Sequence, residues 1–98
     1  MTESDIQAAI VADRRAAGWY VRQFSGNRAK LKHEAGWCDV FAARRGMVIL
    51  IEVKAPGGRW RPQQEQFYDD IGPHLWSTLR YVLARSVEDV IAIAEDAK

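Results

Sequence analysis

The sequence predicts an α+β fold, in which a mixed β-sheet is flanked by helices. Segments with the apolar spacing of helices and segments rich in aromatic and β-branched residues follow one another in the order αβββαβα. Elements of both types in one short chain favour helices packed on a sheet. Because 98 residues support one modest core, we expect a single domain over residues 1–98.

The first helix and the first strand have clear boundary signals. Thr2 or Ser4 can cap a helix, since each is followed three residues later by an acid or an amide, and Gly18 can end it. Residues 19–24 have the aromatic and β-branched composition of a strand. Residues 25–36 lack periodicity, which predicts a long loop.

The remaining elements follow from similar signals. Strands are expected at residues 37–43 and 47–54, close enough in sequence to form an antiparallel hairpin. A helix that begins at Pro62 leads to a strand at residues 79–85, which should lie parallel to the strand before the helix. Ser86 is expected to cap the final helix.

The turn of the hairpin decides which residues face each other across the two strands. A two-residue turn at Arg45 and Gly46 would place Asp39 opposite Glu52. A three-residue turn that includes Arg44 would shift the pairing by one residue. In the first case the two carboxylates lie about 5 Å apart on one face of the sheet.

A charged pair at the end of an apolar strand is the strongest functional signal. Glu52 and Lys54 point to one side of the sheet, and Ile51 and Val53 point to the other. Burying two charges costs several kcal/mol unless they are paired or hold a metal. Asp39 and Glu52 can share Mg²⁺, while Lys54 orients water or stabilises a phosphate transition state. A structural ion pair or a solvated sheet face is the alternative.

Basic residues gather in two places, although the formal net charge is only +1. Arg59 and Arg61 flank Trp60, and a second group precedes the hairpin. We expect both groups to contact DNA phosphates, unless they form an ordinary polar surface. The second group consists of Arg22, Arg28, Lys30 and Lys32.

The location is expected to be cytoplasmic, without a membrane partner. No apolar stretch reaches the roughly 18 residues that span a bilayer, and the N-terminal residues are polar and acidic. Cys38 is the only cysteine, which excludes an intramolecular disulfide.

These residues also resemble a known family. Asp39, followed by Glu52 and Lys54, resembles the D…(D/E)xK motif of the PD-(D/E)xK nuclease superfamily. The stretches GWCDVF, ILIEVKAPGGRWRPQQEQF and YVLARSVEDV resemble its virus-type replication-repair nuclease branch, VRR-NUC, over nearly the whole chain. The resemblance implies a restriction-endonuclease-like core. Cys38 departs from it, because the family usually has proline before the aspartate.

The resemblance implies roles for particular residues. Asp39, Glu52 and the backbone carbonyl of Val53 would bind Mg²⁺ or Mn²⁺, and Lys54 would be the catalytic lysine.

Three further residues match the family outside this motif. Gln64 and Tyr68 match a QxxxY pattern and share a helical face, where they would support catalysis or touch DNA. Glu3 matches an acid of the first helix that would join the catalytic group; helix capping is the alternative for this residue.

The implied function is a metal-dependent, structure-specific DNA endonuclease. Small members of this branch resemble Holliday-junction resolvases of phage or bacterial origin, which act in DNA repair. Such an enzyme cuts two strands symmetrically, so we expect a homodimer. The alternative is a catalytically inactive DNA-binding module of the same fold.

Overall fold

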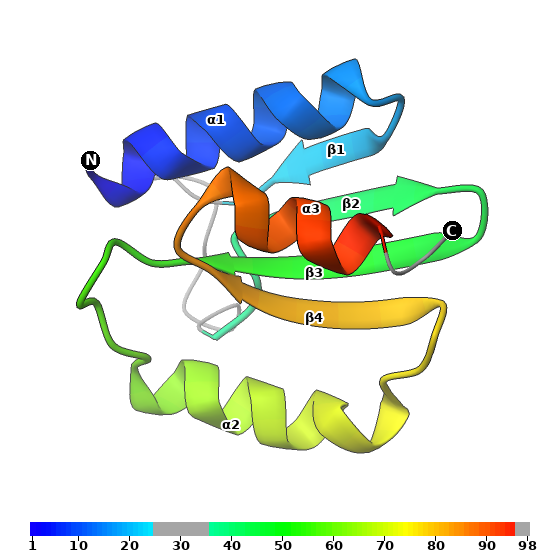
Figure 1. Ribbon diagram of the computed structural model, residues 1–98. Helices are drawn as coiled ribbons and strands as arrows, with labels where there is room; N and C mark the ends of the chain where they lie inside the picture. The colour runs from blue at the N-terminus through cyan, green and yellow to red at the C-terminus, as the bar shows by residue number, and fades with distance from the viewer. Residues whose placement is uncertain (25–35, 96–98) are drawn as a thin grey trace.

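The computed structural model describes residues 1–24 and 36–95. These residues form a mixed four-stranded sheet flanked by helices, which confirms the predicted α+β class (Figure 1). The elements in chain order are α1 (Glu3–Ala16), β1 (Tyr20–Gln23), β2 (Val40–Arg44), β3 (Met47–Val53), α2 (Pro62–Ile71), the short 3-10 helix η2 (Gly72–His74), β4 (Leu79–Ala84) and α3 (Val87–Glu95).

The strands lie side by side in chain order, β1-β2-β3-β4. β2 is antiparallel to both β1 and β3, whereas β4 is parallel to β3, so the predicted hairpin and the predicted parallel strand are confirmed. Arg44 pairs with Met47, which leaves Arg45 and Gly46 as a two-residue turn. Both turn residues have positive φ, 47° and 86°, as a tight turn between twisted antiparallel strands requires.

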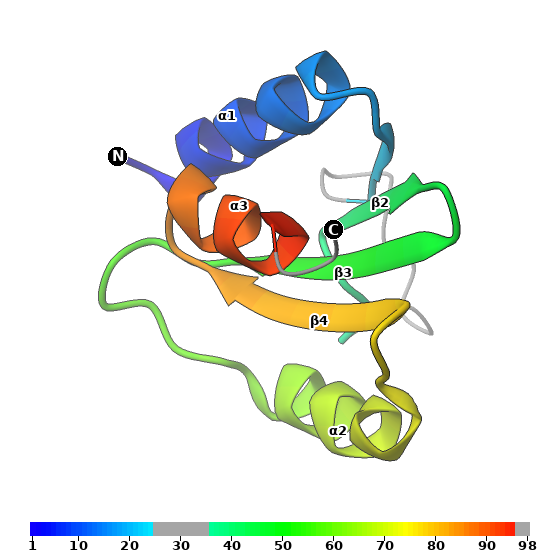
Figure 2. The ribbon, with the colours of Figure 1, turned by 45° about the vertical axis from the view of Figure 1, so that its right-hand side comes forward.

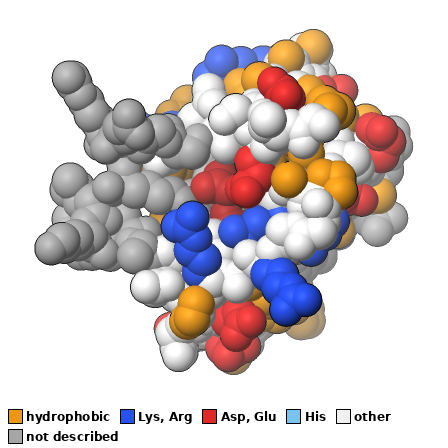
Figure 3. Space-filling view, turned by 90° about the vertical axis from the view of Figure 1, so that its left-hand side faces the viewer, with side chains coloured by type: hydrophobic (Ala, Val, Ile, Leu, Met, Phe, Trp, Pro, Cys, Tyr) orange, Lys and Arg blue, Asp and Glu red, His pale blue; other side chains and the backbone are white. Residues whose placement is uncertain are grey.

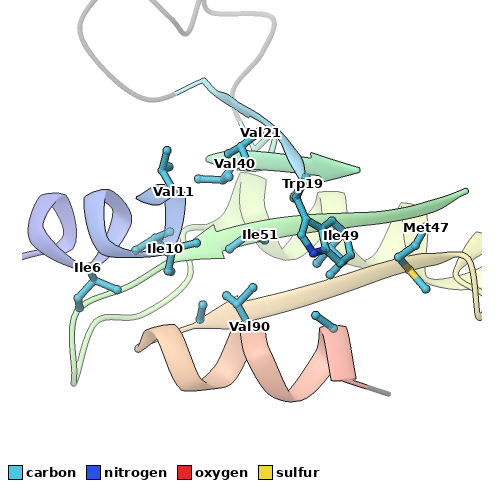
Figure 4. Close-up of a cluster of buried hydrophobic side chains, with 14 residues drawn as sticks. Ile6, Ile10, Val11, Trp19, Val21, Val40, Met47, Ile49, Ile51 and Val90 are labelled. Atoms are coloured by element: carbon cyan, nitrogen blue, oxygen red, sulfur yellow. The ribbon is translucent and has the colours of Figure 1, made fainter. Parts of the chain in front are cut away.

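The hydrophobic core lies between the sheet and the helices α1 and α3 (Figure 4). Ile49, Ile51 and Val53 alternate along β3 and are wholly buried in this core. Ile10 from α1 and Val90 from α3 belong to the same cluster. Because side chains alternate along a strand, the intervening residues of β3 lie on the opposite face of the sheet.

Local hydrogen bonds fix where the helices begin. The Oγ1 atom of Thr2 accepts the N–H of Asp5, and the Asp5 carboxylate accepts the N–H of Thr2, both at 3.1 Å. Ser86 caps α3 as predicted, because its Oγ accepts the N–H of Asp89. Within the described part of the chain, no helix combines the length and apolar character that a membrane span needs.

Aromatic side chains attach α2 to the sheet. β4 separates α2 from α1 and α3 in both ribbon views (Figures 1 and 2). The ring of Phe67 lies 5.2 Å from that of Trp37 and 6.0 Å from that of Tyr81, and the ring of Tyr68 lies 5.2 Å from Tyr81. Phe67 and Tyr68 belong to α2 and Tyr81 belongs to β4, so this aromatic cluster holds the helix beside the face that carries Glu52.

Candidate active site

The predicted charged pair lies at the end of β3. Glu52 is the penultimate residue of the strand and is wholly buried, with 0% of its surface exposed. Lys54 follows the strand and is 5% exposed. Ile51 and Val53 point into the core under α1 and α3, so Glu52 and Lys54 lie on the opposite face, as the alternation predicts. The protein therefore desolvates a carboxylate and an amine on one face of one strand.

Asp39 is brought against both neighbours of Glu52. The regular pairing of β2 with β3 ends where Val40 pairs with Ile51. Asp39 then bends, and its N–H donates to the carbonyl of Ile51 at 3.0 Å. Its carboxylate accepts the N–H of Val53 at 2.9 Å. This departure from the ladder re-aims the side chain, as bulges beside functional sites do.

Backbone geometry adds a third oxygen donor. The N–H and C=O groups of one residue in a strand point toward the same neighbouring strand. Because the N–H of Val53 bonds to Asp39, the carbonyl of Val53 also faces the Asp39 side. Two carboxylates and a carbonyl are oxygen ligands of the kind that Mg²⁺ and Mn²⁺ take.

The side-chain donors at this site are few. Among the residues that the structure describes, no group of three or more His, Cys, Asp or Glu side chains is placed to hold a metal ion. A cation bound by Asp39 and Glu52 would therefore need the carbonyl of Val53, water or a substrate phosphate to complete its ligands.

Tyr81 lies close to the acidic group, and the sequence reasoning did not identify it. Tyr81 pairs with Leu50 across β3 and β4, which places its side chain on the face of Glu52. Burial, followed by the charges of Glu52, Cys38 and Asp39, raises the pKa of the Tyr81 phenol well above its usual value. The Tyr81 phenol therefore stays protonated to a higher pH than the phenol of an exposed tyrosine.

A tight turn directs the chain away from Lys54. The N–H of Gly58 donates to the carbonyl of Ala55 at 2.9 Å, and Gly57 has a φ of +84°. Pro56 at the second position and a positive-φ glycine at the third define a type II turn. The APGG stretch therefore makes a fixed corner between Lys54 and the segment that leads to α2.

Arg85 clamps this corner. Its Nη1 atom donates to the carbonyls of Ala55 and Gly58, both at 2.9 Å. The backbone N–H of Arg85 donates to the carboxylate of Asp89 in the first turn of α3, at 2.8 Å. The start of α3 thereby positions the residue that holds the turn after Lys54. These contacts span 30 and 27 residues along the chain, so sequence spacing did not indicate them.

The first turn of α2 lies against the chain that enters β2. A Cβ atom built on Gly36 would lie 2.4 Å from the carbonyl oxygen of Gln63, and Gly36 has a φ of +93°. Only glycine satisfies both constraints at this position. The approach places the start of α2 beside the segment that leads to Asp39.

The two residues of the predicted QxxxY pattern lie one turn apart on α2 and differ in burial. Gln64 is buried, and its Oε1 atom accepts the N–H of Arg61 at 2.7 Å, which caps the start of α2. Tyr68 is 39% exposed, and its ring lies 5.1 Å from that of Trp60. A catalytic role for Gln64 stays a prediction, because the hydrogen bond of its side chain caps the helix.

The other predicted residues lie on the surface or outside the described residues. Arg22, Arg59 and Arg61 are exposed, and the guanidinium of Arg22 lies over the ring of Phe24 at 5.8 Å. Glu3 is exposed in the first turn of α1. Arg28, Lys30 and Lys32 lie outside the described residues.

Charges of both signs meet at the end of the sheet where β3 and β4 finish. Figure 3 looks onto this end and shows Asp and Glu side chains directly beside Lys and Arg side chains.

Comparison with known proteins adds nothing to this geometry: no family model, curated protein or solved structure matches the chain. The nuclease resemblance therefore stays a prediction.

The Arg85 clamp can be tested without an activity assay. Arg85→Ala removes two hydrogen bonds to backbone carbonyls and should lower the free energy of unfolding by about 1 kcal/mol. It should also speed hydrogen exchange of the Gly58 amide, whose acceptor sits in the clamped turn. Denaturant titration and exchange measured by NMR give the two values.

Arg80→Ala is the matched control for this experiment. Arg80 also donates to two backbone carbonyls, those of Ser77 and Ile93, at the other end of β4. The control should lose comparable stability and leave exchange at Gly58 unchanged. Equal exchange at Gly58 in both variants would show that Arg85 does not hold the turn.

The environment of Tyr81 predicts a dependence of stability on alkaline pH. Its pKa is raised in the fold from an ordinary value of 10.0, so the unfolded chain releases the phenol proton first as pH rises. This contribution to stability is fully present below about pH 10 and is lost as pH rises through the folded pKa. Denaturation of wild type between about pH 8 and pH 11 should show a steeper fall than Tyr81→Phe. Parallel curves for the two proteins would refute the assignment.

Proposed function

We propose that the protein hydrolyses phosphodiester bonds of DNA with the help of Mg²⁺ or Mn²⁺, as a VRR-NUC nuclease of the PD-(D/E)xK superfamily with a restriction-endonuclease-like core. The observation that carries the proposal is the wholly buried carboxylate of Glu52, with Asp39 bonded to the neighbouring amide of Val53 and Lys54 on the same side. The order of helices and strands along the chain supports the same assignment.

The chemistry of the donors fits a hard divalent cation. Asp39, Glu52 and the carbonyl of Val53 would hold it, because all three are oxygen donors on neighbouring strands. When bound, such a cation would neutralise charge on a phosphate and lower the pKa of a water molecule.

The residues around the carboxylates have separate tasks in this proposal. Lys54 would orient the attacking water or stabilise the charge that builds on the phosphate, since it is nearly buried on the same face as Glu52. Arg59 and Arg61 are exposed just after the clamped turn and would contact neighbouring phosphates. Arg85 would keep these arginines in a constant position relative to Lys54 through its bonds to Ala55 and Gly58.

Branched or junction DNA is the proposed substrate, and a homodimer is the proposed assembly. Both rest on the resemblance to small junction resolvases. A two-fold dimer presents two identical sites to two symmetric strands. A DNA substrate also agrees with the cytoplasmic location expected from the sequence.

A second candidate is a DNA-binding module of the same fold without catalysis. The exposed Arg59 and Arg61 suit this candidate equally well, because contact with phosphates needs no catalytic group. In that case the exposed arginines would bind DNA without any cleavage, and the buried charges of Glu52 and Lys54 would only stabilise the arrangement of the strands.

Substitution of Glu52 separates the two candidates. Purified protein, a labelled four-way junction and Mn²⁺ should give cleavage, and Glu52→Gln should lower the rate more than about a hundredfold. Glu52→Gln should still fold, because glutamine keeps the shape of the side chain and removes the charge that costs most to bury. Gel assays measure cleavage, and far-UV circular dichroism with denaturant titration checks the fold.

Glu65→Gln is the matched control, because it removes an exposed acid from the first turn of α2. It should cleave like wild type. Junction binding by wild type without any cleavage in Mn²⁺ would support the inactive module instead. Cleavage that survives Glu52→Gln would remove Glu52 from the catalytic group.

A further inference from the structure

Two aromatic rings meet at the surface beside the candidate active site. The rings of Trp60 and Tyr68 lie 5.1 Å apart with an angle of 37° between their planes. Tyr68 is 39% exposed, and Trp60 is partly exposed although its indole nitrogen is buried. The pair therefore shows aromatic surface to solvent from two elements, the segment before α2 and α2 itself. We call it the Trp60–Tyr68 pair.

The packing of α2 does not account for the exposure of this pair. Phe67 already joins the helix to Trp37 and to Tyr81, and it is more buried than Tyr68. Tyr68 lies at the outer edge of the aromatic cluster. A polar residue at this position would leave less apolar surface exposed to water. Tyr20 and Trp76 are more exposed than Tyr68, but Trp60 and Tyr68 place two aromatic rings in contact at the surface, which makes the pair a candidate binding surface.

The charges around the pair indicate the chemistry of that partner. Arg59 and Arg61 lie on either side of Trp60 in sequence, and both are exposed. Guanidinium groups next to aromatic faces suit a ligand that carries phosphates together with flat rings. Nucleic acid with an unstacked base has both features.

The pair is connected to the carboxylates through one residue. The ring of Tyr81 lies 6.3 Å from that of Trp60 and 5.2 Å from that of Tyr68. Tyr81 pairs with Leu50, two residues before Glu52 on β3, so its side chain lies on the face of the sheet that carries Glu52. A base against the pair would therefore lie on the same side of the sheet as the carboxylates.

We propose that the Trp60–Tyr68 pair is a stacking platform for an unpaired base of the DNA strand held at Asp39 and Glu52. The proposal rests on the nuclease function above and adds a substrate class to it, DNA with an unpaired nucleotide beside the scissile phosphate. A base inside a continuous duplex is already stacked on both sides and offers no free face to the platform. An unpaired base at a branch or an overhang offers one, and Arg59 and Arg61 can contact its flanking phosphates.

Binding without metal tests the platform separately from catalysis. The full chain is titrated in EDTA with two DNAs of equal length, a blunt duplex and a duplex whose overhang carries 2-aminopurine. Wild type should quench the 2-aminopurine fluorescence by stacking. Tyr68→Leu should weaken binding of the overhang DNA about tenfold, leave the blunt duplex unchanged and abolish the quenching. Tyr68→Phe keeps the ring and should behave like wild type.

Trp76→Leu is the matched control, because Trp76 is 78% exposed and precedes the opposite end of β4. It should leave binding and quenching unchanged. The platform is overturned if Tyr68→Leu weakens both DNAs equally, if it weakens neither, if Trp76→Leu has the same effect, or if wild type binds neither DNA.

Cleavage assays on the same proteins keep the two proposals distinguishable. Stacking by wild type without cleavage in Mn²⁺ would overturn the nuclease and leave the platform standing. Cleavage that depends on Glu52, without any effect of Tyr68→Leu, would overturn the platform alone.

Discussion

The hydrogen bond between the amide of Val53 and the carboxylate of Asp39 joins the start of one strand to the end of the next. It is a bond to a charged acceptor, a class roughly twice as strong as bonds between neutral groups. Val53 follows Glu52 directly in the chain. The same bond therefore brings the carboxylate of Asp39 close to the strand position at which Glu52 is buried. A cation held between two nearby carboxylates would offset their mutual repulsion. That offset is the physical basis of the proposed metal centre.

The rest of the fold packs against that pair of strands from both faces. The core under α1 and α3 holds β3 from one face through Ile49, Ile51 and Val53. The aromatic cluster holds α2 beside the other face. Arg85 connects the start of α3 to the turn after Lys54. Each contact limits the movement of residues that the proposed phosphate-binding site would keep in a constant geometry.

The sequence predicted the features that depend on local pattern. Alternation along β3 predicted that Ile51 and Val53 face the core, with Glu52 between them on the other face, and both apolar residues lie in the core cluster. The hairpin register depended on whether the turn has two residues or three. Arg45 and Gly46 both have positive φ, and Arg44 pairs with Met47. The turn therefore has two residues and not three. The cap at Ser86 was likewise predicted, because capping involves residues three apart. At the first helix the sequence left Thr2 and Ser4 as alternatives, and the structure shows that Thr2 is the cap.

Features that depend on contacts between distant segments could not be predicted in the same way. The bend at Asp39 interrupts a register that the turn alone would extend regularly. Tyr81 reaches the site through the parallel register of β3 with β4, and a crossover through a helix leaves that register unspecified in the sequence. Arg85 contacts backbone carbonyl groups, and every residue has such a group, so the residue types in the sequence do not indicate which carbonyls it binds. Gln64 matched a family pattern, yet the bond that the structure assigns to it is a helix cap.

Diffraction from crystals soaked in Mn²⁺ would show whether the two carboxylates hold a cation, because anomalous scattering locates the ion without reference to activity. One strong peak is expected within about 2.5 Å of carboxylate oxygens from both Asp39 and Glu52. The same peak should be absent from crystals of Glu52→Gln. A saturated soak with no peak at these two residues, or with the ion bound elsewhere, would contradict the account.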